Sequence, residues 1–296
     1  VEHSLVMVDS SLGEPRISLL STVSEYGRDK LKEMGKEACK AFALRHAQHF
    51  AGFGTEEKLL ALSKHGGSDQ KRWLHENLEN LVSATQNAIH FGWPDEAKNA
   101  CQGCNEVWAS RGPFSTGLAL TEHVLAFNFP ADQVFRLHMQ RAHFHHRLGN
   151  LSQSEEDYAK AVKMAQEIPY PRGEREALRW CGRLKMQLGN LEDAEKLFDT
   201  SLALSREQNA DVEVGRASCL KGMVVSQKGY HKRALKWLQK GLTIFESTGA
   251  RLDQGITTHI IGEIQCRLGD LDQAKVLFEK AAEIAGEAGD QITQNR

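Results

Sequence analysis

The sequence predicts an all-α fold built from stacked antiparallel helix pairs. Four glycines stand 40 residues apart in the same local frame: Gly149, Gly189, Gly229 and Gly269. A fixed period of roughly 20 to 50 residues is the signature of a stacked repeat architecture. Apolar residues recur at helical spacing through most of the chain, and only six prolines interrupt its 296 residues.

The overall composition points to no special environment. With 41% hydrophobic residues the chain can bury a sizeable core, and its net charge of −2 gives no general attraction to nucleic acid or anionic membranes. We see no signal peptide and no apolar run long enough for a membrane span, and we expect a cytoplasmic protein without cofactors. The absence of an initiator Met suggests a processed product or a fragment.

Residues 1–35 differ from the rest of the chain. Two short β-prone runs, at residues 4–8 and 16–20, flank a segment rich in turn-forming residues, and this pattern predicts a hairpin. Ser21 or Thr22 can cap a helix that ends near Gly35. Residues 36–130 form a second predicted domain, with helices at about 38–50, 56–64, 72–91, 94–111 and 114–127.

Residues 131–296 form the repeat domain. Small residues lie seven before, five after and twelve after each turn glycine, and a large apolar residue lies nine after it. Seven residues before the glycines stand Ala142, Gly182, Gly222 and Gly262, and five after them stand Ser154, Ala194, Ala234 and Ala274. Twelve after them stand Ala161, Ser201, Gly241 and Ala281, and the large residues nine after them are Tyr158, Phe198, Leu238 and Phe278. Small residues let two helices approach closely, and the large residue fills the space between them. Each turn glycine then separates a helix A from a helix B.

These offsets closely resemble those of the tetratricopeptide repeat, although the usual repeat is about 34 residues long. The resemblance implies a right-handed superhelical solenoid of three full repeats plus one related pair, which meets the number needed for a stable stack. It also implies a concave face lined by the A helices. Solenoids of this kind bind partners along an extended surface.

A second resemblance covers most of residues 4–126. It rests on three strings that occur in the same order, at residues 15–26, at 45–50 (Arg-His-Ala-Gln-His-Phe) and at 76–84 (Glu-Asn-Leu-Glu-Asn-Leu-Val-Ser-Ala). These strings are similar to the end of the winged-helix domain, and the helices after it, in STAND-type signal-transducing ATPases, including large bacterial transcriptional regulators. The resemblance implies that residues 1–35 are a winged-helix remnant and that an ATPase module lies upstream. This chain itself contains no P-loop string.

Two clusters could carry chemistry. Cys101 and Cys104 form a lone C-x-x-C, but no second pair at zinc-binding spacing accompanies them, and they lie nine and twelve residues after Gly92, at core offsets. We expect them to be core cysteines. His138, His143, His145 and His146 crowd one helix and could bind a metal or sense pH, but no cysteine or carboxylate at helical spacing completes a ligand set.

The family's concave positions, transferred by offset from each glycine, define the predicted groove. The strongest candidates for this groove are Arg136, Met139, His143, His146, Arg147, Arg179, Arg183, Met186, Arg216, Met223, His259 and Arg267. Arginine and methionine are enriched at protein interfaces, and arginine forks bind carboxylates. The groove therefore predicts an acidic or carboxylate-bearing peptide or protein partner. Equally, these arginines could pair with glutamates of the chain itself, such as Glu176.

We expect a non-enzymatic protein-interaction or signal-sensing region of a STAND-type regulator, because no catalytic motif is present. The alternatives are a DNA-contacting regulator that uses the N-terminal hairpin, which the near-neutral charge opposes, and a small-molecule or metal-binding helical domain. Self-association through the ends of the stack is a further expectation.

Overall fold

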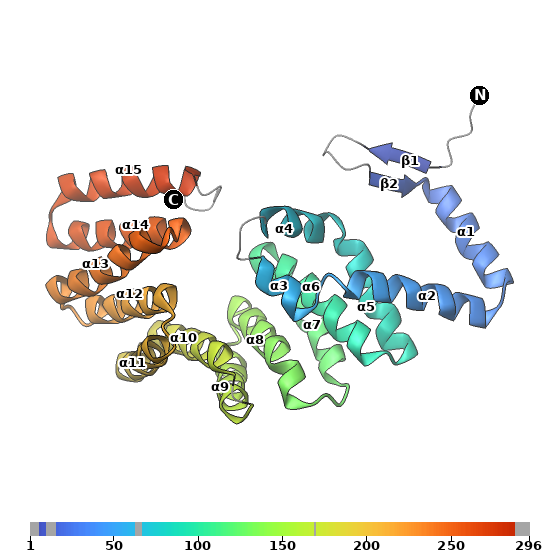
Figure 1. The fold of residues 1–296 in the computed structure, drawn as a ribbon, viewed down its shortest axis with the longest axis horizontal. Helices are drawn as coiled ribbons and strands as arrows, with labels where there is room; N and C mark the ends of the chain where they lie inside the picture. The colour runs from blue at the N-terminus through green and yellow to red at the C-terminus, as the bar shows by residue number, and fades with distance from the viewer. Residues whose placement is uncertain (1–5, 10–15, 63–66, 169, 288–296) are drawn as a thin grey trace. The chain divides into compact units, whose positions relative to one another are not determined.

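A computed structural model describes residues 6–9, 16–62, 67–168 and 170–287. The chain divides into two compact units, residues 1–128 and 129–296, which are described separately. Figure 1 shows the order of their helices along the chain. Within the described ranges, no helix combines the length and apolar character needed to cross a bilayer.

The first unit contains two short strands followed by seven helices in its described part. These elements are β1 (Val6–Asp9), β2 (Arg16–Leu19), α1 (Ser21–Glu33), α2 (Lys36–Ala51), α3 (Glu56–Ala61), α4 (Gly67–Glu76), α5 (Leu78–Phe91), α6 (Pro94–Arg111) and α7 (Phe114–Leu125). Helices α2, α5 and α6 pack against one another, and α4 and α7 each contact α6. The core of this unit therefore lies around α6.

The N-terminal strands pair antiparallel, with Val6 opposite Leu19 and Asp9 opposite Arg16. The segment that joins them lies outside the described residues. This pair of four-residue strands does not by itself identify a winged helix, and the other elements of the described residues are all helices. Gly35, with φ of 95°, separates α1 from α2 at the predicted stop.

One predicted helix of the first unit is wrong. Residues 72–91 form the end of α4 and the whole of α5 rather than one continuous helix. The interruption lies at Asn77, whose φ and ψ of −102° and 16° are not helical. The Asn77 side-chain amide donates to the carbonyl oxygen of Trp73 at 3.0 Å. Asparagine side chains can hydrogen-bond to the backbone in this way, which makes asparagine a poor residue inside a helix. The spacing of the apolar residues, on which the predicted helix rested, gives no information about this.

The second unit is a stack of four helix pairs in its described part. The A helices are α8 (Ala131–Arg147), α10 (Pro171–Gln187), α12 (Asp211–Gln227) and α14 (Arg251–Leu268). The B helices are α9 (Leu151–Glu167), α11 (Leu191–Glu207), α13 (His231–Thr248) and α15 (Leu271–Glu287). Equivalent helices begin 40 residues apart, which confirms the predicted period.

The turn glycines have the predicted left-handed backbone. The φ angles of Gly149, Gly189, Gly229 and Gly269 lie between 79° and 87°. After each glycine the next backbone N–H returns to the last turn of helix A, as from Asn150 to the His145 carbonyl at 2.8 Å. This hydrogen bond closes a Schellman-type turn, for which glycine carries no Cβ penalty.

The small and large residues of the repeat pack as predicted. A Cβ atom at Gly182 would lie 2.5 Å from Phe198 Cε1, and one at Gly262 would lie 2.8 Å from Phe278 Cε1. Phe198 and Tyr158 are fully buried between their helices. In the three pairs that have glycine at this position, the close approach of helices A and B therefore depends on the missing side chain; the first pair has Ala142 there.

The A helices form the continuous layer of the stack. Contacts join α8 to α10, α10 to α12 and α12 to α14, while each B helix packs on its own A helix and on the next one. Residues at equivalent positions on successive A helices are therefore brought side by side. We call the surface that they share the A-helix face.

Candidate functional site

Side-chain contacts join three of the predicted residues, His146, Arg179 and Arg267, to the neighbouring A helix. His146 Nε2 lies 2.5 Å from Gln187 Oε1, which joins α8 to α10. Arg179 Nη1 lies 3.1 Å from Glu213 Oε2, which joins α10 to α12. The Arg267 guanidinium donates to Ser226 Oγ at 3.3 Å, which joins α14 to α12. Because each contact spans a repeat, the residues line adjacent positions on the A-helix face.

Part of this face is neutralised by the chain itself. Arg216 donates to both carboxylate oxygens of Asp253, with Nη2 at 2.8 Å from Oδ2, and to Glu213 Oε1 at 2.8 Å. Burial alone would lower the pKa of Arg216, but Asp253 and Glu213 raise it above its ordinary value. Arg179, Glu213, Arg216 and Asp253 thus form an ion-pair ladder across α10, α12 and α14. Its acidic members are Glu213 and Asp253, not Glu176.

Arg183 lies outside this ladder. Its guanidinium carbon lies 4.9 Å from the centroid of the Trp180 ring, and its side chain is accessible to solvent. No carboxylate of the described residues lies within ion-pair distance of it. Partial burial and the neighbouring charge of Arg179 lower the pKa of Arg183. A ligand carboxylate at this position would relieve both effects.

An unsatisfied hydroxyl lies beside the same tryptophan. The Tyr158 ring stacks on Trp180 with centroids 6.3 Å apart and planes 6° apart. Tyr158 is 1% exposed, and its hydroxyl has no hydrogen-bond partner among the described residues. Burial raises the pKa of Tyr158, so this hydroxyl stays a proton donor. The His143 ring contacts Trp180 edge-on, with 5.6 Å between the ring centroids.

Arg183, Trp180, Tyr158 and His143 therefore form one cluster at α8, α9 and α10, which we call the Arg183 cluster. It offers an accessible guanidinium with no ion pair among the described residues, next to an aromatic platform. This combination suits a carboxylate attached to an apolar group.

The other histidines of α8 surround a buried carboxylate. Asp157 on α9 accepts from Arg141 Nε at 2.8 Å, with His138 Nδ1 at 3.5 Å and His145 Nε2 at 4.0 Å from its oxygens. Burial alone would raise the pKa of Asp157, but His138 and Arg141 hold it at about 2. Across the described ranges, no three His, Cys, Asp or Glu side chains converge as a metal site. This histidine arrangement ties α8 to α9.

Cys101 and Cys104 are fully buried in α6, as predicted for core cysteines. Asn105 donates to Thr121 Oγ1 at 2.8 Å and lies 3.6 Å from Cys101 Sγ. Burial raises the pKa of Cys101 to about 12 and raises that of Cys104 well above its ordinary value. Because both thiols stay protonated at neutral pH, they are poor nucleophiles and poor metal ligands.

Several predicted groove residues lie in the core or are only partly accessible. Met139 is 7% exposed and packs in the cluster around Tyr158 and Cys181, because α10 covers it. Met186 and Met223 are partly buried against the cluster around Phe198. At the far end of the face, His259 lies 3.4 Å from Glu263 and contacts the ring of Phe278. Arg136 is half-buried and Arg147 is exposed, both on α8.

Sequence reasoning did not single out Trp180, or the acidic residues Glu213 and Asp253. Trp180 follows Arg179 directly and is the one aromatic residue of α10. Glu213 and Asp253 both lie sixteen residues before a turn glycine. That shared offset is a signal that could have identified the ladder.

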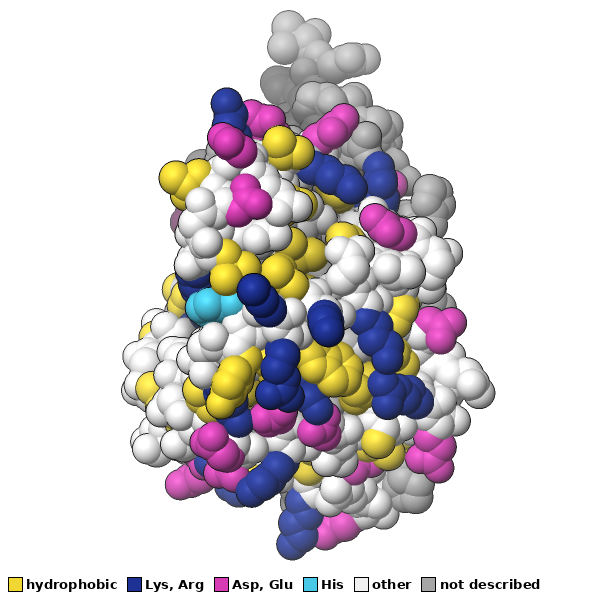
Figure 2. All heavy atoms as spheres, turned by 90° about the vertical axis from the view of Figure 1, so that its left-hand side faces the viewer, with side chains coloured by type: hydrophobic (Ala, Val, Ile, Leu, Met, Phe, Trp, Pro, Cys, Tyr) yellow, Lys and Arg dark blue, Asp and Glu magenta, His cyan; other side chains and the backbone are white. Residues whose placement is uncertain are grey.

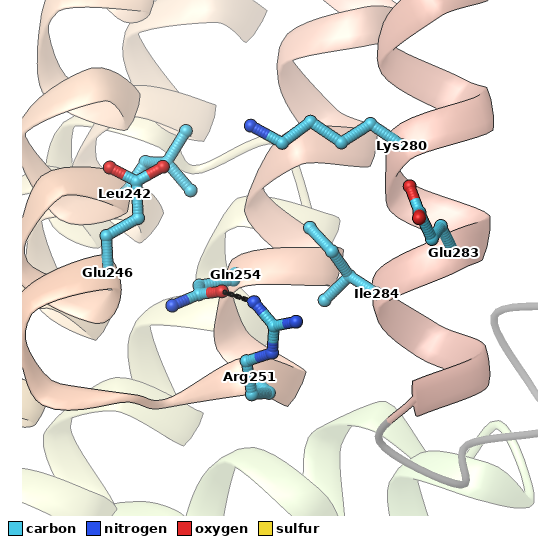
Figure 3. Close-up of a pocket in the computed structure, with 7 residues that line it drawn as sticks. All are labelled: Leu242, Glu246, Arg251, Gln254, Lys280, Glu283 and Ile284. Carbon is cyan, nitrogen blue, oxygen red and sulfur yellow. Dashed lines mark hydrogen bonds between the residues drawn. The ribbon is translucent and has the colours of Figure 1, made fainter.

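A pocket of about 300 Å³ lies between α13, α14 and α15, away from the Arg183 cluster. In Figure 3, Lys280 extends from α15 toward the side lined by Leu242 and Glu246. The Arg251 guanidinium lies 3.2 Å from Gln254 Oε1 across its floor. Two carboxylates and two cations line this pocket, so it favours neither anions nor cations.

Comparisons with known proteins agree with the repeat architecture. Residues 173–247 match a tetratricopeptide repeat family model, and residues 135–168 and 259–287 match a second model with the same description. The chain therefore contains tetratricopeptide repeats. The sequence matched no curated protein.

Solved structures with a similar fold include three that cover most of this chain. The structure of BtubC (BKLC) from P. vanneervenii has a TM-score of 0.58 at 16% identity, covering 72% of this chain and 92% of that one. A Rap protein complexed with Competence and Sporulation Factor has a TM-score of 0.58 at 12% identity, covering 86% and 79%. NprR in complex with its cognate peptide NprX has a TM-score of 0.58 at 13% identity, covering 92% and 76%. At these identities the likeness concerns the fold.

Proposed function

We propose that the repeats bind an acidic peptide or protein segment along the A-helix face, and that this chain acts as a scaffold or sensor rather than as an enzyme. The observation that carries the proposal is the Arg183 cluster, where an accessible guanidinium without an ion pair lies over Trp180 and beside the buried Tyr158 hydroxyl. Two of the structures with this fold are complexes, of the Rap protein with Competence and Sporulation Factor and of NprR with its cognate peptide NprX.

The charge distribution of the face indicates where the acidic group binds. Around Arg216 the ladder already satisfies the guanidinium with Asp253 and Glu213. An incoming carboxylate there would have to displace an intramolecular partner, whereas at Arg183 it would meet a cation that lacks one. We therefore place the ligand carboxylate at Arg183, and the remaining groove residues beside the rest of the ligand.

A peptide-display selection tests this function. The full chain is the bait, and the library is selected in parallel against Arg183→Glu and against Arg206→Glu. Arg206 is an exposed arginine on α11, outside the A-helix face. We expect peptides with Asp, Glu or a terminal carboxylate to be enriched by the wild type and the Arg206 variant but not by the Arg183 variant. Enrichment without acidic preference, or equal enrichment by all three proteins, would contradict the proposal.

We further propose that the repeats are the sensor region of a STAND-type regulator, with residues 1–35 as a winged-helix remnant and 36–130 as a helical adaptor. This rests on the three residue strings in the first 126 residues. Ligand binding would then bias an upstream switch between two states. Mass spectrometry of the native protein tests it: we expect a polypeptide well above 33.1 kDa that contains P-loop peptides. A native mass equal to that of this chain would contradict it.

A further inference from the structure

Among the B helices that the structure describes, only α13 has more basic than acidic residues. It carries four Lys or Arg residues (Lys232, Arg233, Lys236 and Lys240) against a single acidic residue, Glu246. Its neighbours α11 and α15 are net acidic, with five acidic against two basic residues on α11 and four against two on α15. Since all four repeats share one core, this reversal of surface charge is not required by the fold.

The basic side chains of α13 have no carboxylate partner. None of the four lies within ion-pair distance of an acidic group in the described residues. The basic residues nearby on α12 do have partners: Lys221 pairs with Asp199 at 2.5 Å, and Lys228 pairs with Glu195 at 2.7 Å. Asp199 and Glu195 of α11 therefore pair with lysines of α12 and not with α13. The four basic side chains of α13 remain exposed to solvent.

Aromatic rings lie among these cations. Lys240 Nζ lies 5.7 Å from the Trp237 ring centroid, and Lys221 Nζ lies 4.8 Å from it on the other helix. The Arg233 guanidinium lies over Tyr230 at 5.3 Å. A pocket of about 370 Å³ is lined by Arg233, Lys236, Trp237 and Lys240. Figure 2 shows Lys and Arg side chains gathered around hydrophobic groups on this side of the stack.

We propose that this surface, which we call the α13 patch, is a second docking site, separate from the A-helix face, and that it binds a narrow acidic segment of a partner protein. Arg233, Lys236 and Lys240 recur at i, i+3 and i+7, which places them along one side of the helix over about 10 Å. A segment with carboxylates at matching spacing would pair with all three. An apolar side chain between the carboxylates would rest on Trp237.

The flanking helices favour a narrow partner over an extended polyanion. A flat anionic membrane or a nucleic-acid strand that crossed the patch would also meet exposed carboxylates of α15, such as Glu279 and Glu283. Those carboxylates would repel it. A single peptide lying along α13 avoids them, so charge complementarity selects that occupant.

Fluorescence anisotropy with labelled probes tests the proposal on the full chain. The main probe is a short peptide with glutamates at i, i+3 and i+7 and a leucine at i+4. A scrambled peptide of the same composition, vesicles of phosphatidylcholine with phosphatidylserine, and a single-stranded oligonucleotide are the comparisons. We expect the spaced peptide to bind most tightly, with an affinity that falls as salt increases.

Lys236→Glu combined with Lys240→Glu is expected to weaken that binding by about tenfold or more. The matched control reverses two exposed lysines elsewhere on the B helices, Lys160 and Lys275, and should change it by less than about twofold. Arg183→Glu measures how much of the probe binds at the A-helix face instead: a loss as large as that of the α13 variant would assign the peptide to that face and overturn the proposal. Equal binding of the scrambled peptide, stronger binding of vesicles or oligonucleotide, or unchanged binding by the α13 variant would overturn the proposal. Circular dichroism checks that each variant is folded.

Discussion

Gly182 illustrates how single residues set the geometry of the stack. It lies against the buried ring of Phe198, and a Cβ there would lie 2.5 Å from Cε1, 2.9 Å from Cζ and 3.0 Å from Cδ1. Because the ring is enclosed on all sides by the pair of helices, it cannot swing away. The helices must separate to accept even one methyl group.

Gly182→Ala is therefore expected to lower the free energy of unfolding by about 1 to 2 kcal/mol, since overpacking outweighs the better helix propensity of alanine. The matched control is Gly27→Ala in α1, where a Cβ would meet nothing within 4 Å. That variant should keep or slightly raise stability. Urea denaturation compares the two, and a Gly182→Ala variant as stable as the wild type would refute the packing argument.

Asp157 predicts a dependence of stability on acid pH. Its pKa of about 2 lies below the ordinary value of 3.8. A depressed pKa stabilises the fold above the ordinary value, and this contribution, about 2 kcal/mol, disappears as the pH falls from about 4 toward 2. The Asp157→Asn variant should lose about 2 to 3 kcal/mol near neutral pH, because Arg141 loses its two hydrogen bonds to the carboxylate.

Denaturation at about pH 6 and about pH 3 measures this effect. The loss of stability between the two conditions should be smaller in Asp157→Asn than in the wild type. Asp132→Asn, at an exposed position in the first turn of α8, is the control and should behave like the wild type. An equal acid loss in Asp157→Asn would show that other carboxylates dominate.

At the scale of elements, the C-x-x-C pair of α6 packs in the core and is not a reactive site. Cys101 and Cys104 lie on its buried side, and Cys181 and Cys219 are likewise buried in α10 and α12, while Cys266 is exposed. Burial raises the pKa of all four buried thiols. Burial therefore both blocks access to these sulfur atoms and suppresses their reactive thiolate form.

Alkylation with iodoacetamide checks this directly. In the native protein Cys266 should react first and the half-buried Cys39 more slowly, whereas the four buried cysteines should react only after denaturation. Mass spectrometry of digested protein identifies the sites. Rapid labelling of Cys101 or Cys104 under native conditions would revive the redox interpretation of the C-x-x-C pair.

The elements also show what the sequence could and could not predict. The 40-residue period, the turn glycines and the small–large packing were all predictable, because each depends on residues at fixed separations within one repeat. The break at Asn77 was not, because it is a change in the backbone angles of one residue that the spacing of apolar residues does not report. The Arg179–Glu213 and Arg216–Asp253 pairs were not either, because they depend on how neighbouring A helices are set against each other.

At the scale of the whole molecule, the second unit combines a continuous A layer with an uneven distribution of charge. Toward α12 and α14, ion pairs within the chain neutralise the A-helix face, whereas the Arg183 cluster at α8, α9 and α10 keeps a cation with no ion pair among the described residues. The two ends of the face therefore differ in charge. We expect the proposed acidic ligand to bind in one direction, with its carboxylate at the Arg183 end. This orientation follows from the side chains, since the repeated backbone alone would not distinguish the two ends.

We propose above that Arg183 binds a carboxylate of the bound peptide. Isothermal titration calorimetry with an acidic peptide selected by the wild type measures the contribution of this contact to affinity. We expect Arg183→Glu to weaken binding by about a hundredfold, because it replaces attraction by repulsion at a central, partly desolvated contact. Arg206→Glu should leave the affinity within about twofold, as for other exposed surface charges. Equal affinity of the wild type and the Arg183 variant, with both proteins folded, would contradict the account.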